Sequence, residues 1–417
     1  ATGQLVTINT FFCYNMANPN LKWETTITRN IGVDFGFFNS RLTGTIDAYW
    51  NTTKDLLMKT AIPGITGFTS TYANVGQTSN KGIEIALQGV LVKTRDWNVT
   101  AGFNINFNRG KVDKLADNVT GLYGTEWATS STFPKSDYVL KEGRPVGLVR
   151  GLTADGFYTT DDFTYENGVY TLKEGVADVS SAVFPNYHLH NGMNERPAGQ
   201  LAYPGMAKFK DLNDDGIIND DDVDVIGDMT PVHTGGFNIN ATYKNFDLGL
   251  YFNWSYGNEI YNVNKLAALY GYKEGAVYEN KLSIVKDCYK IYDVVNGELV
   301  ALTTPEQLNA ANANAKLPLA YSENGYVSTL GIEDGSYLRL NTLTLGYTLP
   351  KSMLQKAGIS NLRVYGSIYN VFTITGYSGI DAEVSTSTST KTYPQLGMDW
   401  GTYPRARSFV LGVNLSF

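Results

Sequence analysis

The chain has 417 residues, a formal net charge of −7 at pH 7 and a pI near 5.1. This acidic balance, with no basic stripe against it, excludes nucleic acid as an expected partner. Two distant cysteines, Cys13 and Cys288, are too few for a disulfide scaffold. No apolar run reaches about 18 residues, so no transmembrane helix is expected, which does not exclude other ways of residing in a membrane.

The chain starts with ATGQLVTINTFF, which lacks an initiator Met and the basic region of a signal peptide. We therefore expect a trimmed form or a fragment of a longer protein. No Pro/Ser-rich linker or break in composition divides residues 1–417, so a single architecture is expected throughout.

Apolar and polar residues alternate along many segments, beginning with TITRNIGVDFGFF, RLTGTIDAYW and GIEIALQG. In WNVTAGFNINFN the apolar side chains of Trp97, Phe103 and Phe107 share one face, and Asn and Thr occupy the other. GFNINATY and FDLGLYFNW repeat the pattern. A period of two predicts β-strands with one apolar face, and a length of about ten residues suits a tilted strand that crosses a bilayer.

The connections between these segments alternate in length. Short turns are expected at 37–42, 93–97 and 243–246, and long loops at about 59–80, 110–233, 257–334 and 373–404. Short turns on one side and long loops on the other are typical of an antiparallel transmembrane β-barrel. The alternative is a soluble β-sandwich, which would place turn signals at both ends of its strands.

The stretch DLNDDGIINDDDVDVIGD, residues 211–228, holds eight aspartates and no Lys or Arg. Counted from Asp211, oxygen ligands fall at the positions of a calcium loop, and Gly216 occupies the position of the sharp bend. The expected ligands are Asp211, Asn213, Asp215, the carbonyl of Ile217, Asn219 and Asp222. Because Asp closes the loop in place of Glu, weak affinity is expected. The residues on both sides of the loop are expected to be extended. The alternative to a calcium site is a solvated acidic turn without metal.

Nothing in the chain indicates a catalytic site. His188 and His190 could share a strand face, but neither they nor His233 have a further ligand at matched spacing, and they read as loop histidines. No nucleophile elbow, phosphate loop or CxxC is present. TTPEQLNAANANA predicts a loop helix with Thr304 as N-cap and Pro305 at its first position.

Substrate-binding residues are not assigned. Aromatic residues of the expected loops are candidates, although ordinary interface or loop packing explains most such residues. They are Tyr123, Trp127, Tyr270, Tyr272 and Tyr377.

The final strand, SFVLGVNLSF, alternates from Phe409 to Phe417 and ends the chain on an aromatic residue. This ending resembles the C-terminal signal read by the bacterial outer-membrane barrel-insertion machinery. A buried sandwich strand could alternate in the same way, but it has no reason to end on Phe.

Six blocks together resemble the C-terminal part of SusC-like TonB-dependent transporters, the glycan and peptide importers of Bacteroidota outer membranes. The blocks are NPNLKWETT, RLTGTIDAYWNTTKDLL, ANVGQTSNKGIEIAL, KFKDLNDDGIINDDDVDVIGD, NFDLGLYFNWSYGNEIYN and YLRLNTLTLGYTLPKSMLQKAGISNLRVYGSIYNVFTITGYSGIDAEV. The resemblance implies roughly half of a 22-stranded barrel, surrounded by outer-membrane lipids. It also implies a SusD-like lipoprotein over the extracellular mouth and import of oligosaccharides or peptides.

The chain departs from this family in lacking the plug and the TonB-contacting segment, and only about ten to twelve strands are expected. Unpaired edges in hydrocarbon cost several kcal/mol for each unsatisfied group, so we expect an N-terminal companion that completes the barrel. Successive strands cross the membrane in opposite directions. If the last strand ends at the periplasm, the periplasmic side also holds the turns at 38–41, 94–96, 244–245 and 350–360. The loops, including the aspartate-rich one, are then extracellular.

Two other functions remain open at this point. One is a secreted or surface β-rich adhesin or glycan-binding module stapled by calcium, which would stay soluble without detergent. The other is an outer-membrane barrel enzyme, for which no site is found.

Overall fold

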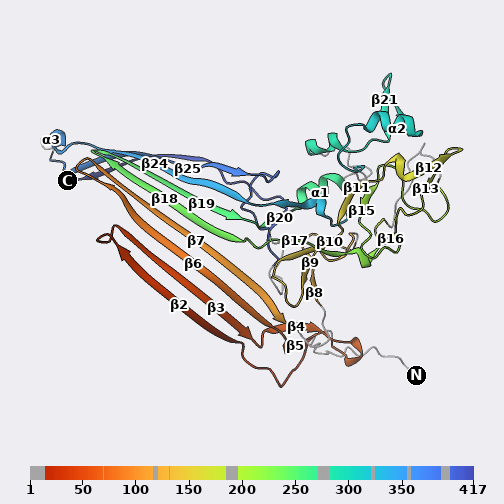
Figure 1. Ribbon diagram of the computed structural model, residues 1–417, viewed down its shortest axis with the longest axis horizontal. Coiled ribbons are helices and arrows are strands. Elements are labelled where there is room, and N and C mark those ends of the chain that lie inside the picture. The colour runs from red at the N-terminus through yellow and green to blue at the C-terminus, as the bar shows by residue number, and fades with distance from the viewer. Residues whose placement is uncertain are drawn as a thin grey trace, which may run out of the picture.

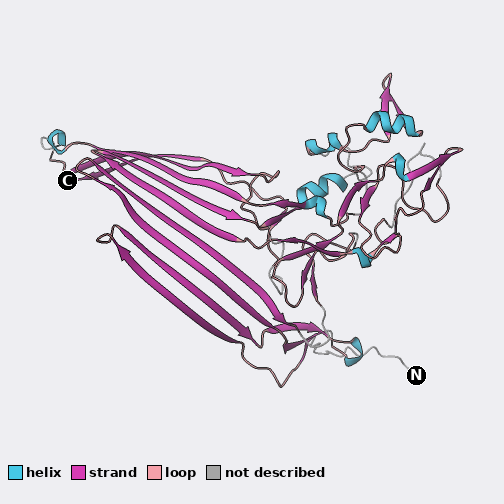
Figure 2. Ribbon diagram, in the orientation of Figure 1, coloured by secondary structure: helices cyan, strands magenta, loops and turns pink. Residues whose placement is uncertain are grey.

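The computed structural model describes residues 15–68, 70–115, 121–130, 132–184, 196–270, 281–320, 325–354, 358–386 and 395–417. A long, twisted sheet forms one part of the molecule, and the connections at one end of its strands fold into a second part (Figures 1 and 2). We call this second part the loop unit; it consists of the described residues within 115–232, 257–336 and 376–407.

The sheet contains nine strands, and every neighbouring pair is antiparallel. Its strands, in spatial order, are β2 (Thr25–Phe37), β3 (Leu42–Lys54), β6 (Gln77–Lys93), β7 (Trp97–Lys114), β18 (His233–Tyr243), β19 (Phe246–Tyr256), β24 (Tyr337–Thr348), β25 (Asn361–Thr375) and β27 (Ser408–Ser416). In the described residues no further strand pairs with the outer edge of β2 or of β27. The predicted all-β antiparallel class is confirmed.

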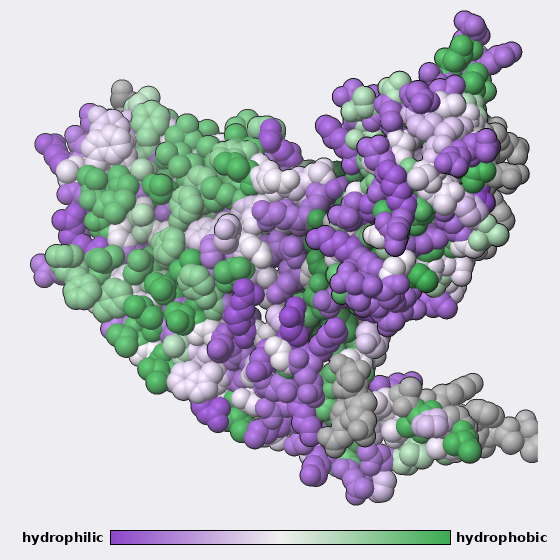
Figure 3. Space-filling view, turned by 45° about the vertical axis from the view of Figure 1, so that its right-hand side comes forward, coloured by the Kyte–Doolittle hydropathy of each residue, from purple (hydrophilic) through white to green (hydrophobic). Residues whose placement is uncertain are grey.

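The register keeps apolar residues together on one face of the sheet. Phe103 of β7 lies opposite Leu87 of β6 and Phe237 of β18, and Phe237 lies opposite Phe252 of β19. The apolar face is accessible from outside the molecule, since Phe103 is 38% exposed and Leu411 of β27 is 89% exposed. In Figure 3 this face appears as a field of apolar residues over the sheet, whereas the loop unit is mainly hydrophilic.

Short turns join the strands at one end of the sheet, at 38–41, 94–96 and 244–245, and 349–360 closes the same end with the short helix α3 (Lys351–Leu354). The other end carries 55–76, 115–232, 257–336 and 376–407. This is the alternation that the sequence predicts. We call the two ends the turn end and the loop end.

The expected strand length of about ten residues is too short for part of the sheet. β6 has 17 residues and β7 has 18, well above the roughly 9 to 11 residues that a tilted strand needs to cross a hydrocarbon layer. On the apolar face, Lys81 lies between Trp50 and Arg109 in the register. These charged residues mark the level where the apolar band ends, so the strands continue beyond it toward the loop end.

The loop unit has a core of its own. Its buried residues come from all three connections and include Tyr158, Tyr203, Tyr261, Val327 and Met398. Its elements are β8 (Leu122–Gly124), β9 (Tyr138–Leu140), β10 (Leu148–Gly151), β11 (Ala154–Phe157), η2 (Thr160–Asp162), β12 (Phe163–Glu166), β13 (Val169–Leu172), β14 (Asp178–Val179), β15 (Ala207–Phe209), β16 (Ile217–Ile218), η3 (Asp220–Asp222), β17 (Asp224–Asp228), β20 (Glu259–Asn262), α1 (Val263–Tyr270), η4 (Ser283–Asp287), β21 (Tyr292–Val295), β22 (Glu298–Ala301), α2 (Pro305–Asn312), η5 (Thr329–Gly331), β23 (Ile332–Asp334) and β26 (Met398–Asp399).

The predicted loop helix is confirmed as α2, where Thr304 Oγ1 accepts the amide of Gln307. Three small strands outside the loop unit, β1 (Asn15–Met16), β4 (Leu57–Ala61) and β5 (Ser70–Asn74), pair beside the short helix η1 (Gly64–Thr66). Within the described ranges every helix is too short or too polar to cross a bilayer.

Candidate functional site

The polar face of the sheet is lined by asparagines whose side-chain oxygens are not all satisfied. Asn51, Asn80, Asn106 and Asn253 each have an amide oxygen that is buried and has no hydrogen-bond partner among the described residues. Buried acceptors are normally satisfied by protein groups or by ordered water. This face is therefore suited to contact water or a polar partner, and it differs in kind from a packed apolar core.

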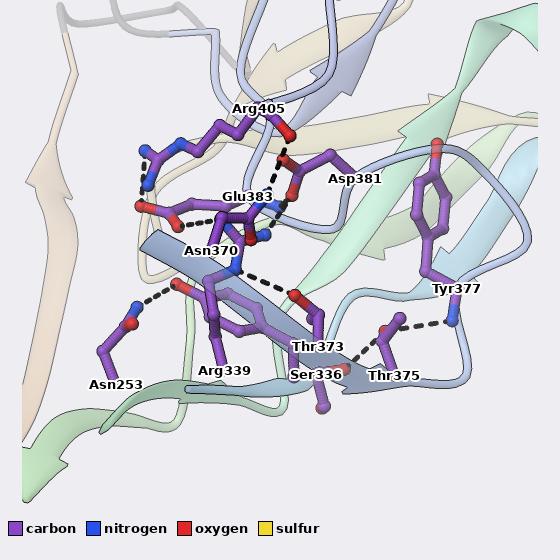
Figure 4. Close-up of polar contacts among 11 residues, drawn as sticks. Asn253, Ser336, Arg339, Asn370, Thr373, Thr375, Tyr377, Asp381, Glu383 and Arg405 are labelled. Carbon is purple, nitrogen blue, oxygen red and sulfur yellow. Dashed lines mark hydrogen bonds and ion pairs between the residues drawn. The ribbon is translucent and has the colours of Figure 1, made fainter. Parts of the chain in front are cut away.

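At the loop end of this polar face, Arg339 of β24 is the centre of an ionic network (Figure 4). Its side chain is only 2% exposed. Its guanidinium pairs with Asp381, donates from Nη1 to Glu383 at 3.1 Å and donates from Nε to Thr373 Oγ1 at 3.0 Å. The ring of Tyr337 lies 5.5 Å from the guanidinium carbon. A charge this deeply buried needs such partners, and Arg339 has two carboxylates.

This network holds the segment that follows β25, residues 376–386, which we call the strap. Burial alone would raise the pKa of Asp381, but the amide of Glu383 and the guanidinium of Arg339 outweigh it and hold that pKa below its ordinary value. Arg405 donates to the other oxygen of Glu383 at 2.9 Å, and Asn370 donates to the backbone carbonyl of Arg405 at 2.7 Å. The strap and the approach to β27 are thus held at the same place.

A further carboxylate, Glu333 of β23, joins the strap to the rest of the loop unit. It accepts the amide and the hydroxyl of Ser378, both at 2.9 Å, and the ammonium of Lys265 from α1 at 3.0 Å. Burial opposes ionisation here too, yet these donors hold the pKa of Glu333 below its ordinary value. The strap is therefore bonded on one side to the sheet and on the other to helix α1.

The aspartate-rich loop folds back on its own backbone. Asp211 accepts the amides of Asp215 and Gly216 at 3.3 and 2.7 Å, and Asp215 accepts the amide of Ile217 at 2.9 Å. Gly216 has a φ of 84°, the left-handed backbone that the predicted bend requires. Extended segments, β15 and β17, flank the loop as expected.

The closing residue of this loop is buried. Asp222 is 0% exposed and accepts the amides of Leu212 and Asn219, at 2.7 and 2.8 Å. The Asn219 amide group donates to the carbonyl of Ile217 at 3.2 Å. Among the described residues no three His, Cys, Asp or Glu side chains gather as a metal site would require, so a cation here would depend on Asn213, Asn219 and the Ile217 carbonyl as well as on carboxylates.

The aromatic candidates take structural positions where they are described. The hydroxyl of Tyr377 donates to Asp399 at 2.7 Å in the interior, and Trp127 packs against the core of the loop unit. Tyr123 is 52% exposed, with the guanidinium of Arg150 4.8 Å from its ring centre. Tyr272 lies outside the described residues, as does the side chain of Tyr270.

Of the three histidines, the structure describes His233, which takes part in packing. His233 accepts from the indole of Trp254 at 3.0 Å and stacks on Tyr256. His188 and His190 lie outside the described residues.

Sequence reasoning missed the Arg339 network. The available signal was an arginine at a polar-face position in YLRLN, where Asn and Thr otherwise prevail, together with the acidic pair of GIDAEV. The spacing of 42 residues between Arg339 and Asp381 crosses a loop, so the sequence pattern does not indicate which carboxylate reaches the arginine.

The chain is similar in sequence to TonB-dependent receptors. Residues 2–203 match the family described as TonB dependent receptor-like, beta-barrel. The chain is 30% identical over 415 residues to TonB-dependent receptor P3 of Formosa agariphila, covering 98% of this chain and 36% of the relative. It is 29% identical over 408 residues to TonB-dependent receptor SusC of Bacteroides thetaiotaomicron, covering 96% and 32%.

Among solved structures, a chain of the RagAB peptide transporter superposes with a TM-score of 0.66 at 25% identity, covering 96% of this chain and 36% of that one. This chain thus spans about a third of the length of the proteins it matches. These relatives are receptors and transporters, which confirms the expectation that the chain is not an enzyme.

Proposed function

Because the chain belongs to the SusC-like TonB-dependent receptors, whose β-barrels lie in the bacterial outer membrane, we propose that it forms the C-terminal wall of an energy-coupled importer. The observation that carries the proposal is the nine-stranded sheet, with an apolar outer face, a polar inner face and loops gathered at one end. In this orientation the turn end is periplasmic and the loop end is extracellular.

The two open edges support the proposal that an N-terminal part completes the barrel. Unpaired backbone groups of β2 and β27 would cost several kcal/mol each in hydrocarbon, so both edges require further strands. The relatives are about three times as long as this chain, which leaves ample length for those strands, a plug and the TonB contact.

We propose oligosaccharides or peptides as the imported substrates and a SusD-like lipoprotein as the lid. Support for a lid comes from the similarity to SusC and to the RagAB transporter, and from the large folded unit at the extracellular end. The name of the RagAB structure favours peptides for that protein, and the unsatisfied amide oxygens of the inner face would accept hydrogen bonds from either substrate class.

We further propose one structural Ca²⁺ in the aspartate-rich loop. The residues that would hold it are Asp211, Asn213, Asp215, the carbonyl of Ile217, Asn219 and Asp222. Their spacing supports the site, as does the bend at Gly216. The cation would offset the local negative charge and brace an extracellular loop; the acidic turn without metal is the competing interpretation.

The import proposal is tested by deleting the gene for the complete transporter and, separately, the gene for its lipoprotein. Growth on one oligosaccharide or peptide as the limiting nutrient should be lost in both strains and restored by each gene returned on a plasmid. If uptake of every tested glycan and peptide survives both deletions, the chain would instead belong to a surface adhesin.

A further inference from the structure

A small β-hairpin projects from the loop unit, far from the sheet. Strands β21 and β22 pair only with each other among the described residues, and the label β21 in Figure 1 marks their position at the outer end of the molecule. The turn between them has Asn296 at a φ of 55° and Gly297 at 86°, the two left-handed residues of a tight type I′ turn. A lone two-stranded hairpin is marginally stable in water unless something packs on it.

One face of this hairpin is apolar along its whole length. Tyr292 lies opposite Ala301 at the base, and Val294 lies opposite Leu299 beyond it. Tyr292 packs against the core of the loop unit, whereas Val294 is 66% exposed and Leu299 69%. The apolar stripe therefore begins in the core and continues into solvent, where no described residue covers it.

The opposite face differs in character. It pairs Asp293 with Val300 and Val295 with Glu298. The ten residues from Tyr292 to Ala301 contain these two carboxylates and no Lys or Arg. The apolar pair Val294 and Leu299 would therefore suit a partner whose apolar patch is bordered by Lys or Arg. Opposite charges at the edge of an interface favour association and guide the approach of the two proteins.

We propose that the face formed by Val294 and Leu299 is a docking surface for the surface lipoprotein of the importer. This inference rests on the proposed function, which puts a lid protein at this end. The hairpin projects from the extracellular unit away from the sheet, so a partner seated on it lies outside the membrane (Figure 1). The free edges of β21 and β22 also offer backbone groups to which a strand of the partner can pair.

The test uses the complete transporter and its lipoprotein, purified in detergent, with affinity measured by biolayer interferometry. The double variant Val294→Ser with Leu299→Ser should bind the lipoprotein at least ten times more weakly than the parent. The matched control, Val295→Ser with Val300→Ser, changes two valines of the other face and should stay within about twofold of the parent, since the predicted contact is apolar and one-sided. Heat-modifiable gel mobility checks that both variants keep the folded barrel.

A photoreactive phenylalanine analogue in place of Leu299 provides the second readout. It should yield an adduct with the lipoprotein. An adduct only within the transporter itself or with a second transporter, or unchanged affinity in the Val294/Leu299 variant, overturns the docking surface. Failure of the parent transporter to bind its lipoprotein at all would instead overturn the lid proposal on which this inference rests.

Discussion

Arg339 and Asp381 form an ion pair that closes 42 residues of chain, with side chains only 2% and 9% exposed. One partner belongs to a strand of the sheet and the other to the strap. Both side chains are largely removed from water. Loss of either charge would leave the other buried without a partner, which lowers the stability of the folded state. The pair therefore fixes the strap against the polar face of the sheet at its loop end.

Replacing the arginine should release the strap. In Arg339→Leu, the carboxylate of Asp381 keeps its burial and loses its cation, which costs about 3 to 5 kcal/mol. We expect amides of 376–386 to exchange with solvent far faster in hydrogen-exchange mass spectrometry, while β24 and β25 stay protected. The control is Arg405→Ala: its side chain is 51% exposed, so loss of its pair with Glu383 should cost no more than about 1 kcal/mol. Equal effects of the two variants would contradict this account.

The strap should also be released by acid. The pKa values of Asp381 and Glu333 lie below their ordinary values in the folded protein. Their contribution to stability is therefore complete above the unfolded pKa values, near pH 4, and is lost as pH falls through the lower folded values. We expect an ordered strap at pH 5 to 8 and a mobile one only below about pH 4.

A spin label at position 380 reports this transition, because Ile380 is 77% exposed. The labelled protein carries Ile380→Cys and Cys13→Ser. Burial of the Cys288 thiol, and to a smaller extent the negative charge of Asp287, raises the pKa of this thiol to about 11. Cys288 should therefore stay unlabelled at neutral pH. Release of the strap above pH 5 would show that the two carboxylates do not control it.

Calcium should order the aspartate-rich loop. Hydrogen exchange of residues 211–222 is compared in millimolar calcium and in the presence of a chelator. In the parent protein calcium should protect these amides, and Asp215→Ala, which removes a proposed ligand, should abolish that protection. Asp214→Asn removes a neighbouring charge from an exposed residue with a φ of 57°, a conformation that Asn tolerates, and should leave that protection intact. Equal protection of the unmodified loop with and without calcium would establish the metal-free acidic turn.

The sheet was predictable because its evidence is local. Alternation along each strand and the short turns at 94–96 and 244–245 follow from neighbouring residues, and the antiparallel register preserves the faces. Strand ends were less predictable, since β6 and β7 extend past the apolar band and only their charged residues show where it stops. The loop unit depends on contacts between distant segments: Tyr138 donates to the carbonyl of Leu396, 258 residues away. Periodicity carries no information about such contacts.

The complete protein should behave as a membrane barrel. We expect it to need detergent for purification and to migrate differently on gels before and after heating, because the apolar outer face of the sheet requires a lipid-like surrounding. Native mass spectrometry should find this wall in one complex with an N-terminal part that carries the plug. Full β-structure as a detergent-free monomer would contradict the assignment to a membrane.

A cryo-EM structure of the complete transporter in detergent tests the central claim most directly, because the claim concerns the two open edges of the sheet. We predict that β2 and β27 each pair along their length with a strand of the N-terminal part, so that this chain forms one side of a closed barrel. A barrel closed by direct pairing of β2 with β27, or an edge left facing detergent, would contradict the account.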